Sequence, residues 1–458
     1  MVNYSTFLKL LKEARILDYN YPVRGDIVWL PYGVKLMQLF KENIISLIEK
    51  EGYEGYDFPI LMQGTYLRQV SKKVSNFLDN VFWIKDKDLF IKPTGEYSIY
   101  PMFHRWIKTQ KDLPLRIYQI GSFFRPIKNC DKLFNLQERH YFFEGHVATK
   151  NEKECEEEFN KAKKINEDIF RLLAIPVLKS ERPLSTNKPV SKKTIGYDTL
   201  LSINKTLQVG AVYLQSDIYS KIFDIKFTDK DNQKKYTHQI TWGSSERLIF
   251  ASLMSTIIKG ELNIIPRIAP YQIVIIPIIK KGKSKEINSF CEKLNKKIIS
   301  SGFSSYIDYS EIPIGKKFHE WGIKGIPLRI DIGDKEIKEK KFSIYSKYLE
   351  VKETYSFNEL SSSRINQFLN KIEENMIKTN EENFKKKIKT IQSIKEIKEK
   401  QKDYPVLKFP LDYDSSLVKK IEKDYSGEIL GFEKNILEEK CIFTGKFTNY
   451  LAYFSRRI

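Results

Sequence analysis

The sequence is poor in cysteine and has no long apolar run. Only 4 cysteines occur in 458 residues, at positions 130, 155, 291 and 441, and they form neither a CxxC pair nor a zinc-type spacing. No apolar run approaches the roughly 18 residues that span a bilayer, and the first residues lack the apolar core of a secretory signal. These absences predict a soluble, intracellular protein of a reducing compartment, without a membrane partner.

Acidic residues are also fewer than basic residues. The chain has 78 Lys and Arg against 58 Asp and Glu, which gives a formal net charge of +20. Such an excess raises the chance of a polyanionic partner, nucleic acid before membrane. Lysine and isoleucine abound throughout, so a biased genome composition would produce much of the same excess without selection for binding. The charge alone leaves both interpretations open.

The length and the 41% hydrophobic content predict two or three folded domains, each with its own core. One boundary is expected at residues 264–270, where two prolines interrupt an apolar run. Beyond it, apolar strands alternate with helices, which indicates a small α/β domain with a partly parallel sheet. A helix is expected from about residue 361, and the lysine-rich tract 384–402 is expected to be a solvated helix face.

The stretch from residue 121 to residue 146 predicts a strand, a polar turn and a second strand. In the second strand Phe142, Glu144 and His146 recur at a spacing of two, so their side chains share one face. Arg125, at the end of the first strand, is a permanent cation suited to bind a carboxylate or a phosphate. The pattern favours a site that meets both an anion and an ammonium group. An amphipathic hairpin whose charged residues face water is the alternative.

A second polar cluster lies at a predicted strand-to-helix junction. Thr94 and Glu96 stand in the turn between a strand that starts at Leu89 and a helix that contains Tyr97 and Trp106. Polar side chains at such a junction can line a pocket. Equally, Thr94 can cap the helix and Glu96 can favour its positive end, so both roles stay open.

Arg247 stands in the first turn of a helix expected at residues 243–251, with Ser244 or Ser245 as its N-cap. A cation near the positive end of a helix costs some tenths of a kcal/mol unless an anion lies beside it. That anion could be Glu246, Glu261 or a bound phosphate.

A series of short motifs then follows in one order from residue 4 to about residue 352. They are Pro31-Tyr-Gly33, Phe58-Pro59, Pro93-Thr-Gly-Glu96, Asp112-Leu-Pro-Leu-Arg-Ile-Tyr-Gln119, Phe124-Arg125, Glu144-Gly-His146, Leu207-Gln-Val-Gly210, Phe223-Asp-Ile-Lys-Phe227, Trp242-Gly-x-Ser-x-Arg247, Pro266-x-Ile-Ala-Pro270 and Gly325-x-Pro-Leu-Arg329. With these motifs in this order, the chain resembles prolyl-tRNA synthetases of the archaeal and eukaryotic type, which are class II aminoacyl-tRNA synthetases.

The resemblance implies three domains. These are an α+β catalytic domain with an antiparallel sheet at 1–265, a Rossmann-like α/β anticodon-binding domain at 266–360, and a small α+β C-terminal domain at 361–458. Of the family's four zinc cysteines only Cys441 remains, so no structural zinc is expected. The family's terminal tyrosine is replaced by Ile458. A homodimer built from residues 34–59 and a cytoplasmic location are further expectations.

The implied reaction starts with attack of the L-proline carboxylate on the α-phosphorus of ATP, which is accompanied by Mg²⁺. Pyrophosphate leaves, and the prolyl group passes from the adenylate to tRNA(Pro). This chemistry requires alignment and cancellation of charge and no protein nucleophile.

By the same resemblance, specific residues surround each substrate. The residues implied around proline are Thr94, Glu96, Arg125, Phe142, Glu144 and His146. Those implied around ATP are Arg125, Gln239, Thr241 and Arg247, of which Arg125 and Arg247 would be catalytic. The positions that read the anticodon would be Asp308, Lys316, Lys317, Arg329 and Asp331.

The sequence departs from the family in the nucleotide half of the site. Phe124-Arg-Pro-Ile127 replaces Phe-Arg-x-Glu, and Leu136-Gln-Glu-Arg139 aligns without a gap to Arg-x-Arg-Glu. Two cations and an acid of the family pattern are therefore missing or exchanged, among them the contacts at Ile127 and Glu138. A one-residue shift would restore Arg139, but it would break the alternation that pairs Glu144 with His146. Ala211-Val-Tyr213 also replaces Thr-Ser-His. The alternatives are therefore a catalytically impaired paralogue that acts as a tRNA-binding or regulatory protein, and an amino-acid-activating enzyme with another acceptor.

Overall fold

The computed structural model describes residues 3–72, 78–183, 191–279 and 284–458. Its contacts divide the chain into two compact units, which are described separately. The first unit comprises Met1–Tyr21, Ile27–Ile45 and Ser252–Glu381, and the second comprises Pro22–Asp26, Ser46–Ala251 and Glu382–Ile458. No helix among the described residues combines the length and the apolar character that crossing a membrane requires.

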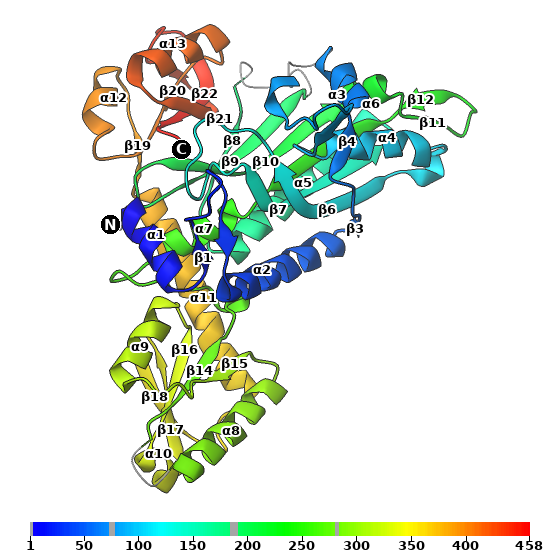
Figure 1. Ribbon diagram of the computed structural model, residues 1–458. Coiled ribbons are helices and arrows are strands. Elements are labelled where there is room, and N and C mark those ends of the chain that lie inside the picture. The colour runs from blue at the N-terminus through cyan, green and yellow to red at the C-terminus, as the bar shows by residue number, and fades with distance from the viewer. Residues whose placement is uncertain (1–2, 73–77, 184–190, 280–283) are drawn as a thin grey trace. The chain divides into compact units, whose positions relative to one another are not determined.

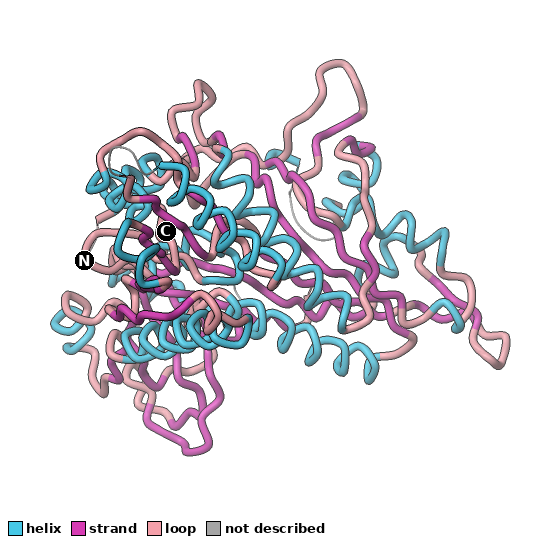
Figure 2. Tube along the Cα trace, turned by 90° about the horizontal axis from the view of Figure 1, so that it is seen from below, coloured by secondary structure: helices cyan, strands magenta, loops and turns pink. Residues whose placement is uncertain are grey.

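The scaffold of the second unit is an antiparallel sheet (Figure 1). Its central strands, in spatial order, are β9 (Lys193–Leu200), β10 (Thr206–Ser216), β13 (His238–Ser244), β7 (Glu138–Thr149) and β6 (Leu115–Phe124), and all neighbours among them are antiparallel. At one edge β3 (Glu54–Gly55) pairs parallel with β6. Figure 2 shows these long strands lying side by side. The antiparallel catalytic sheet expected from the sequence is confirmed.

Helix α5 (Glu152–Leu172) packs on this sheet because its apolar residues return every three or four positions. Cys155, Phe159, Ala162 and Ile169 are all buried at that spacing. The side chain of Asn151 begins the helix by accepting a hydrogen bond from the Glu154 N–H at 2.9 Å. The amphipathic spacing and the N-cap together account for this helix.

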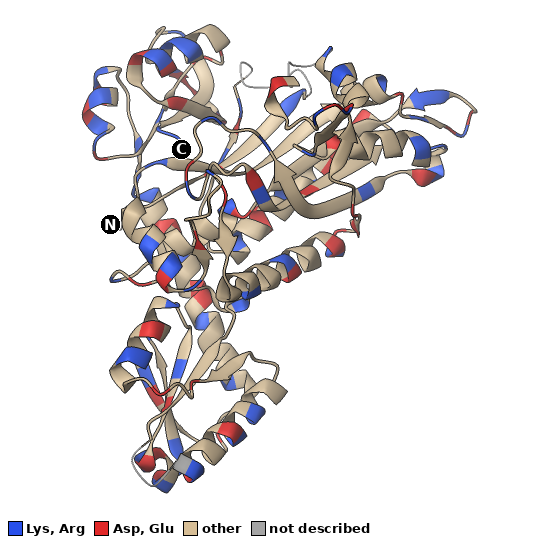
Figure 3. Cartoon of the chain, viewed as in Figure 1, with Lys and Arg blue, Asp and Glu red and all other residues tan. Residues whose placement is uncertain are grey.

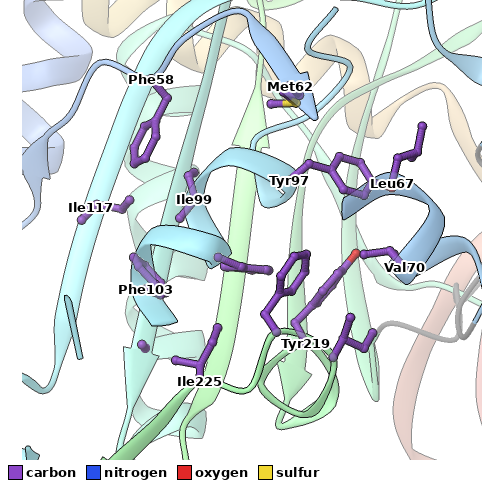
Figure 4. Close-up of a cluster of buried hydrophobic side chains, with 14 of the residues drawn as sticks. Phe58, Met62, Leu67, Val70, Tyr97, Ile99, Phe103, Ile117, Tyr219 and Ile225 are labelled. Atoms are coloured by element: carbon purple, nitrogen blue, oxygen red, sulfur yellow. The ribbon is translucent and has the colours of Figure 1, made fainter. Parts of the chain in front are cut away.

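A hydrophobic cluster anchors α4 (Glu96–Trp106) to the sheet. Ile99 and Phe103 of α4 lie among Ile117 of β6, Tyr219 of α6 (Ile218–Phe223) and Phe58 (Figure 4). The same cluster reaches α3 (Gly64–Ser71) and the paired strands β4 (Leu61–Gln63) and β5 (Leu89–Ile91). This packing fixes the turn that precedes α4.

The C-terminal strands continue the same sheet. β19 (Ile388–Thr390), β20 (Val406–Pro410), β22 (Phe447–Ser455) and β21 (Glu428–Lys440) join β8 (Leu178–Glu181) through the pair Phe432 and Glu181. Helices α12 (Lys395–Lys400) and α13 (Ser415–Tyr425) accompany them. Arg457 also reaches Asp198 of β9, with Nη2 2.8 Å from the carboxylate.

The prediction of one solvated helix over the tract 384–402 is wrong. Helix α11 (Ser362–Lys385) ends where this tract begins. Strand β19 follows, and α12 is a separate short helix. Ile391 and Ile397 are buried against Phe409 and Phe454, so the tract contributes to a core despite its many lysines. Apolar burial outweighed the charge pattern on which the prediction rested.

The first unit contains a five-stranded sheet in the order β15, β14, β16, β17, β18. β14 (Ile273–Pro277) pairs parallel with β15 (Ser305–Ile307) and β16 (Leu328–Ile332), whereas β17 (Lys341–Ser346) and β18 (Val351–Ser356) are antiparallel. Helices α8 (Ser284–Ser300), α9 (Ile314–Ile323) and α10 (Asp334–Glu339) alternate with the strands. The predicted partly parallel α/β arrangement is confirmed.

The remaining elements are short, except for two N-terminal helices. These helices are α1 (Tyr4–Glu13) and α2 (Pro31–Lys50), and α7 (Arg247–Ser255) follows β13. The strand pairs β1 (Leu17–Asp18) with β2 (Val28–Trp29) and β11 (Lys226–Thr228) with β12 (Lys234–Tyr236) are antiparallel. In the described ranges, 3-10 turns lie at Leu78–Asn80, Gln110–Asp112 and Pro266–Ile268.

Candidate active site

A polar pocket lies on the central strands of the second unit, beside the turn that leads into α4. The strands β10, β13 and β7 are neighbours in the sheet, which is why residues far apart in sequence meet there. Of the predicted site residues, the pocket is lined by Thr94, Glu96, Arg125, Phe142, Glu144, Thr241 and Arg247.

One end of the pocket is acidic. Thr94 Oγ1 donates a hydrogen bond to Glu96, and Glu144 lies close to the same turn. A β-carbon added to Gly95 would lie 1.7 Å from Oε1 of Glu144 and 2.4 Å from Nε2 of Gln119. Glycine therefore lets the turn approach the second carboxylate closely, so that two acids face one cavity.

The pKa of Glu144 is lowered although the residue is only 4% exposed. Burial opposes its charged form, but the charge of His146, hydrogen bonds from His146 and Gln119, and the charge of Lys92 together lower its pKa. Both hydrogen-bond partners lie near the same atom, because Oε1 accepts from Gln119 Nε2 at 2.7 Å and is 3.1 Å from His146 Nε2. The second oxygen of Glu144 is thereby left for a cation in the pocket.

His146 lies beneath the pocket and outside its lining. Its side chain is 0% exposed, and Nδ1 is 3.2 Å from the hydroxyl of Tyr100, which itself donates to Gln215. Nε2 is also 3.4 Å from Oγ1 of Thr241. The spacing of two does place His146 on the face of Glu144, but its contacts position that carboxylate.

Lys92 and Gln119, which were not among the predicted site residues, extend this network. Lys92 is 3% exposed, and its Nζ donates to the Phe58 carbonyl at 3.1 Å and to Gln119 Oε1 at 3.3 Å. Because a lysine only donates, Gln119 turns its oxygen to Lys92 and its NH₂ group to Glu144. Strand register could have suggested Gln119, since it stands directly opposite Glu144.

On the basis of the resemblance to prolyl-tRNA synthetases, replacing Lys92 by methionine is expected to raise the KM for proline by up to roughly 10-fold, because the Gln119 amide loses the contact that orients it. Burial lowers the pKa of Lys92, so methionine also relieves a desolvation cost and the fold is expected to persist. The measurement is exchange kinetics against proline and ATP separately, with the exposed Lys87→Met as control. Equal changes in both KM values would contradict a positioning role.

The other end of the pocket is cationic. Arg125 Nε donates to the Pro93 carbonyl at 2.8 Å, Arg139 Nη1 to Ser245 Oγ at 3.3 Å, and Arg247 Nε to the Phe134 carbonyl at 2.7 Å. These partners are neutral oxygen atoms, so they orient the three guanidinium groups without cancelling their charge. Such an arrangement suits a polyphosphate.

The pKa of Arg247 shows that the cationic end of the pocket lacks an anion. Burial, and next the charge of Arg139, lower the pKa of Arg247 to about 9, although Glu246 and Asp131 act in the opposite direction. Glu261, one anion considered from the sequence, pairs with Lys347 instead. A bound phosphate would restore the pKa of Arg247 and remove the repulsion between the arginines.

A β-bulge brings Arg139 into the pocket. In the pairing of β6 with β7, Gly121 is opposite Phe142 and Phe123 is opposite Arg139. An advance of two residues along β6 therefore corresponds to three residues along β7. The additional residue of β7 turns Arg139 to the face of Phe142 and Glu144, and all three line the pocket. The prediction that a shift restoring Arg139 must break the Glu144 and His146 pair is therefore wrong.

Comparisons with known proteins agree with this geometry. The family model of the class II tRNA synthetase core domain (G, H, P, S and T) matches residues 82–255, and that of the anticodon binding domain matches residues 272–367. The proline–tRNA ligase of Methanopyrus kandleri is 31% identical over 98% of this chain and 95% of that protein. The chain belongs to the proline–tRNA ligase family.

Further relatives agree with this membership. The proline–tRNA ligase of Methanosphaera stadtmanae is 30% identical and covers 100% of both chains. A crystal structure of prolyl-tRNA synthetase from Cryptosporidium parvum, complexed with halofuginone and AMPPNP, matches with a TM-score of 0.92 at 23% identity, over 99% of this chain and 97% of that one. At that identity the structural likeness shows the fold.

Of the remaining predicted site residues in the second unit, one lines the pocket and one does not. Thr241 donates its Oγ1 hydrogen to the Gly145 carbonyl at 3.1 Å and lines the pocket. Gln239 is fully buried and outside the lining, and neither polar atom of its side chain has a hydrogen-bond partner among the described residues. Helix α7 begins at Arg247, later than expected, because β13 extends to Ser244, and the Arg247 N–H lies 3.4 Å from Ser245 Oγ.

The structure separates the five predicted anticodon positions into two groups. Lys317 Nζ donates to the Asp308 carbonyl at 2.7 Å, and both residues are buried, whereas Lys316 is exposed. Arg329 pairs with Asp331, with Nε 2.9 Å from Oδ1. The guanidinium of Arg329 also lies 3.9 Å from the ring centroid of Phe318 and 4.8 Å from that of Tyr345. These positions remain a prediction.

Proposed function

We propose that the protein is an ATP-dependent proline–tRNA ligase. It activates L-proline with ATP to prolyl-adenylate, releases pyrophosphate and transfers the prolyl group to tRNA(Pro). Relatives that carry this name match nearly the whole chain. The most direct support in the structure is a single pocket with carboxylates at one end and three arginines at the other. Those are the charges that a proline ammonium and a triphosphate require.

The acidic end would bind proline. The free oxygen of Glu144 accepts a hydrogen bond from the secondary ammonium, and Glu96, oriented by Thr94, faces the same group. The ring of Phe142, whose centroid lies 4.6 Å from that of Phe123, offers an apolar wall to the pyrrolidine. His146 contributes through its contact with Glu144.

The cationic end would bind ATP and stabilise charge at the reacting phosphorus. Arg125, whose Nε donates to the carbonyl of Pro93 beside Thr94, would contact the proline carboxylate and the α-phosphate. Arg139 and Arg247 would hold the terminal phosphates, and Thr241 the nucleotide. A contact of Gln239 with the nucleotide stays a prediction. No protein nucleophile is required, because alignment and charge cancellation promote the displacement.

Several finer features belong to the same proposal. Mg²⁺ would arrive with the ATP phosphates; no group of three His, Cys, Asp or Glu that could hold a metal occurs in the described part of the chain. Glu246 offers one buried carboxylate oxygen, Oε1, that has no partner beside the arginines and suits a hydrated Mg²⁺. A homodimer, a cytoplasmic location and the domain boundaries near residues 265 and 360 remain proposals.

Proline-dependent exchange of pyrophosphate into ATP tests this function. The purified protein is expected to catalyse the exchange with proline and to charge tRNA(Pro), and Arg125→Ala is expected to reduce exchange by roughly 100-fold or more. Arg105→Ala, at an exposed position in the last turn of α4, is the matched control. Background exchange by the unmodified protein at saturating substrates would instead favour a tRNA-binding paralogue. The restored Arg139 argues against that alternative.

A further inference from the structure

The ring nitrogen Nε2 of His146, beneath the acidic end of the pocket, faces two hydrogen-bond acceptors. It lies 3.1 Å from Oε1 of Glu144 and 3.4 Å from Oγ1 of Thr241. The same Oε1 accepts a hydrogen bond from Gln119, and the Thr241 hydroxyl already donates its hydrogen to the Gly145 carbonyl at 3.1 Å. Nε2 therefore needs a proton of its own to bond to either neighbour.

The other ring nitrogen of His146, Nδ1, also meets an acceptor. It lies 3.2 Å from the hydroxyl of Tyr100, and that hydroxyl donates its single hydrogen to Oε1 of Gln215. Burial raises the pKa of Tyr100 well above its usual value, so the phenol keeps this hydrogen. Because the hydrogen is directed to Gln215, the oxygen of Tyr100 can bond to Nδ1 only as an acceptor.

Gln215 lies at an irregularity of strand β10. The register with β13 shifts between Leu214 and Ser216, which places Gln215 at a β-bulge. The side chain is 1% exposed and lines the pocket. An apolar side chain of similar size would fill the same space but could not accept the hydrogen of Tyr100. The amide oxygen of Gln215 thus decides in which direction the Tyr100 hydroxyl points.

Few charged groups surround these bonds. Strands β10 and β13 contain no Lys, Arg, Asp or Glu, and Figure 3 shows the long strands of the sheet mostly tan. The charged and titratable groups that act on the bonds within the described residues are Glu144, Glu96, Lys92, Tyr100 and Tyr219. With His146 charged, this end of the pocket has two cations and two carboxylates, so zwitterionic proline enters without changing the balance of charge.

We propose that His146 is an imidazolium ion paired with Glu144, and that Gln215 is the positioning residue that keeps it charged. Gln215 acts through Tyr100, because it takes the one hydrogen that Tyr100 could otherwise donate to a neutral Nδ1. The positive ring favours the carboxylate form of Glu144, which accepts the ammonium group of the substrate. The inference deepens the proposed function and rests on it for the identity of that substrate.

The protons of His146 are measured by nuclear magnetic resonance of the full-length protein, labelled with nitrogen-15 in its 5 histidines. At about pH 7.5 an ordinary histidine is mostly neutral, whereas His146 is expected to show the signature of two protonated ring nitrogens. Its signal is identified by its absence in His146→Gln. If no histidine of the unmodified protein shows this signature, the proposal is wrong, whether or not the protein is active as a ligase.

Gln215→Leu tests the positioning role. It frees the hydrogen of Tyr100 for Nδ1, so His146 is expected to become neutral and the KM for proline to rise about 10-fold, with little change in the KM for ATP. The acidic limb of kcat/KM for proline is expected to move to higher pH, because the lost charge of His146 no longer favours the carboxylate of Glu144. Gln215→Glu keeps an oxygen that accepts from Tyr100 and should retain the imidazolium signature.

The control is Gln233→Leu, at an exposed position in the turn between β11 and β12, which should change none of these quantities. An imidazolium signature that persists in Gln215→Leu, or equal rises of both KM values, would contradict the role of Gln215. Absence of exchange in the unmodified protein would refute the ligase function and leave the resonance result to be judged by itself.

Discussion

Replacing Arg139 by alanine is expected to lower kcat/KM for ATP in proline-dependent exchange by at least about 100-fold. A fixed cation aimed at charge that develops in the transition state is typically worth roughly 3–4 kcal/mol. Arg139 meets that description, because the bulge in β7 turns it into the pocket and its Nη1 donates to the neutral Ser245 hydroxyl. The KM for proline is expected to change far less, since Arg139 lies at the cationic end.

Thermal stability provides the second measurement for Arg139. Burial, and also the nearby charge of Arg125, lower the pKa of Arg139, so its charged form is disfavoured in the folded state. Arg139→Ala is therefore expected to melt at an unchanged or higher temperature while it loses activity. The exposed Arg105→Ala should change neither quantity. A variant of Arg139 that melts earlier but keeps its ATP kinetics would mean that the residue is structural.

The strand alternation correctly predicted that Phe142 and Glu144 lie on one face of β7. Phe142 and Glu144 do share a face, because side chains in a regular strand alternate with a period of two. His146 shares it too, yet its full burial follows from how Tyr100 and Thr241 pack around it, and tertiary packing has no local signal in the sequence. The same is true of Lys92, which reaches Glu144 through Gln119.

The nucleotide half was harder to predict because its geometry depends on one irregularity. A bulge adds a residue to β7 between Arg139 and Phe142, and this changes which residues face the pocket without changing composition or periodicity elsewhere. The sequence did contain one sign of the bulge. The family motif required Arg139 to face the site, whereas regular strand alternation from Glu144 and His146 placed it on the opposite face. Likewise, the single pair of Phe432 with Glu181 that extends the sheet is a long-range contact that no local pattern encodes.

Replacing Glu144 by glutamine is expected to lower kcat/KM for proline by roughly 10- to 150-fold, and to change the kinetics for ATP much less. A hydrogen bond to a charged group contributes about 1.5–3 kcal/mol, and the amide oxygen of glutamine carries no charge for the proline ammonium. Gln119 donates to Glu144 and would still find an acceptor in the variant. Glu138→Gln is the matched control, since Glu138 lies on the same strand but outside the pocket.

The stability of Glu144→Gln should depend on pH in a defined direction. The charge of His146 and the hydrogen bonds of the network overcome burial and lower the folded-state pKa of Glu144. Its stabilising contribution is therefore present above the pKa of an unfolded glutamate and is lost as the pH falls through the folded value. Urea unfolding should show the parent more stable than the variant at pH 7, with the difference shrinking in acid. A difference that stays constant across this range, together with normal proline kinetics, would remove Glu144 from the binding site.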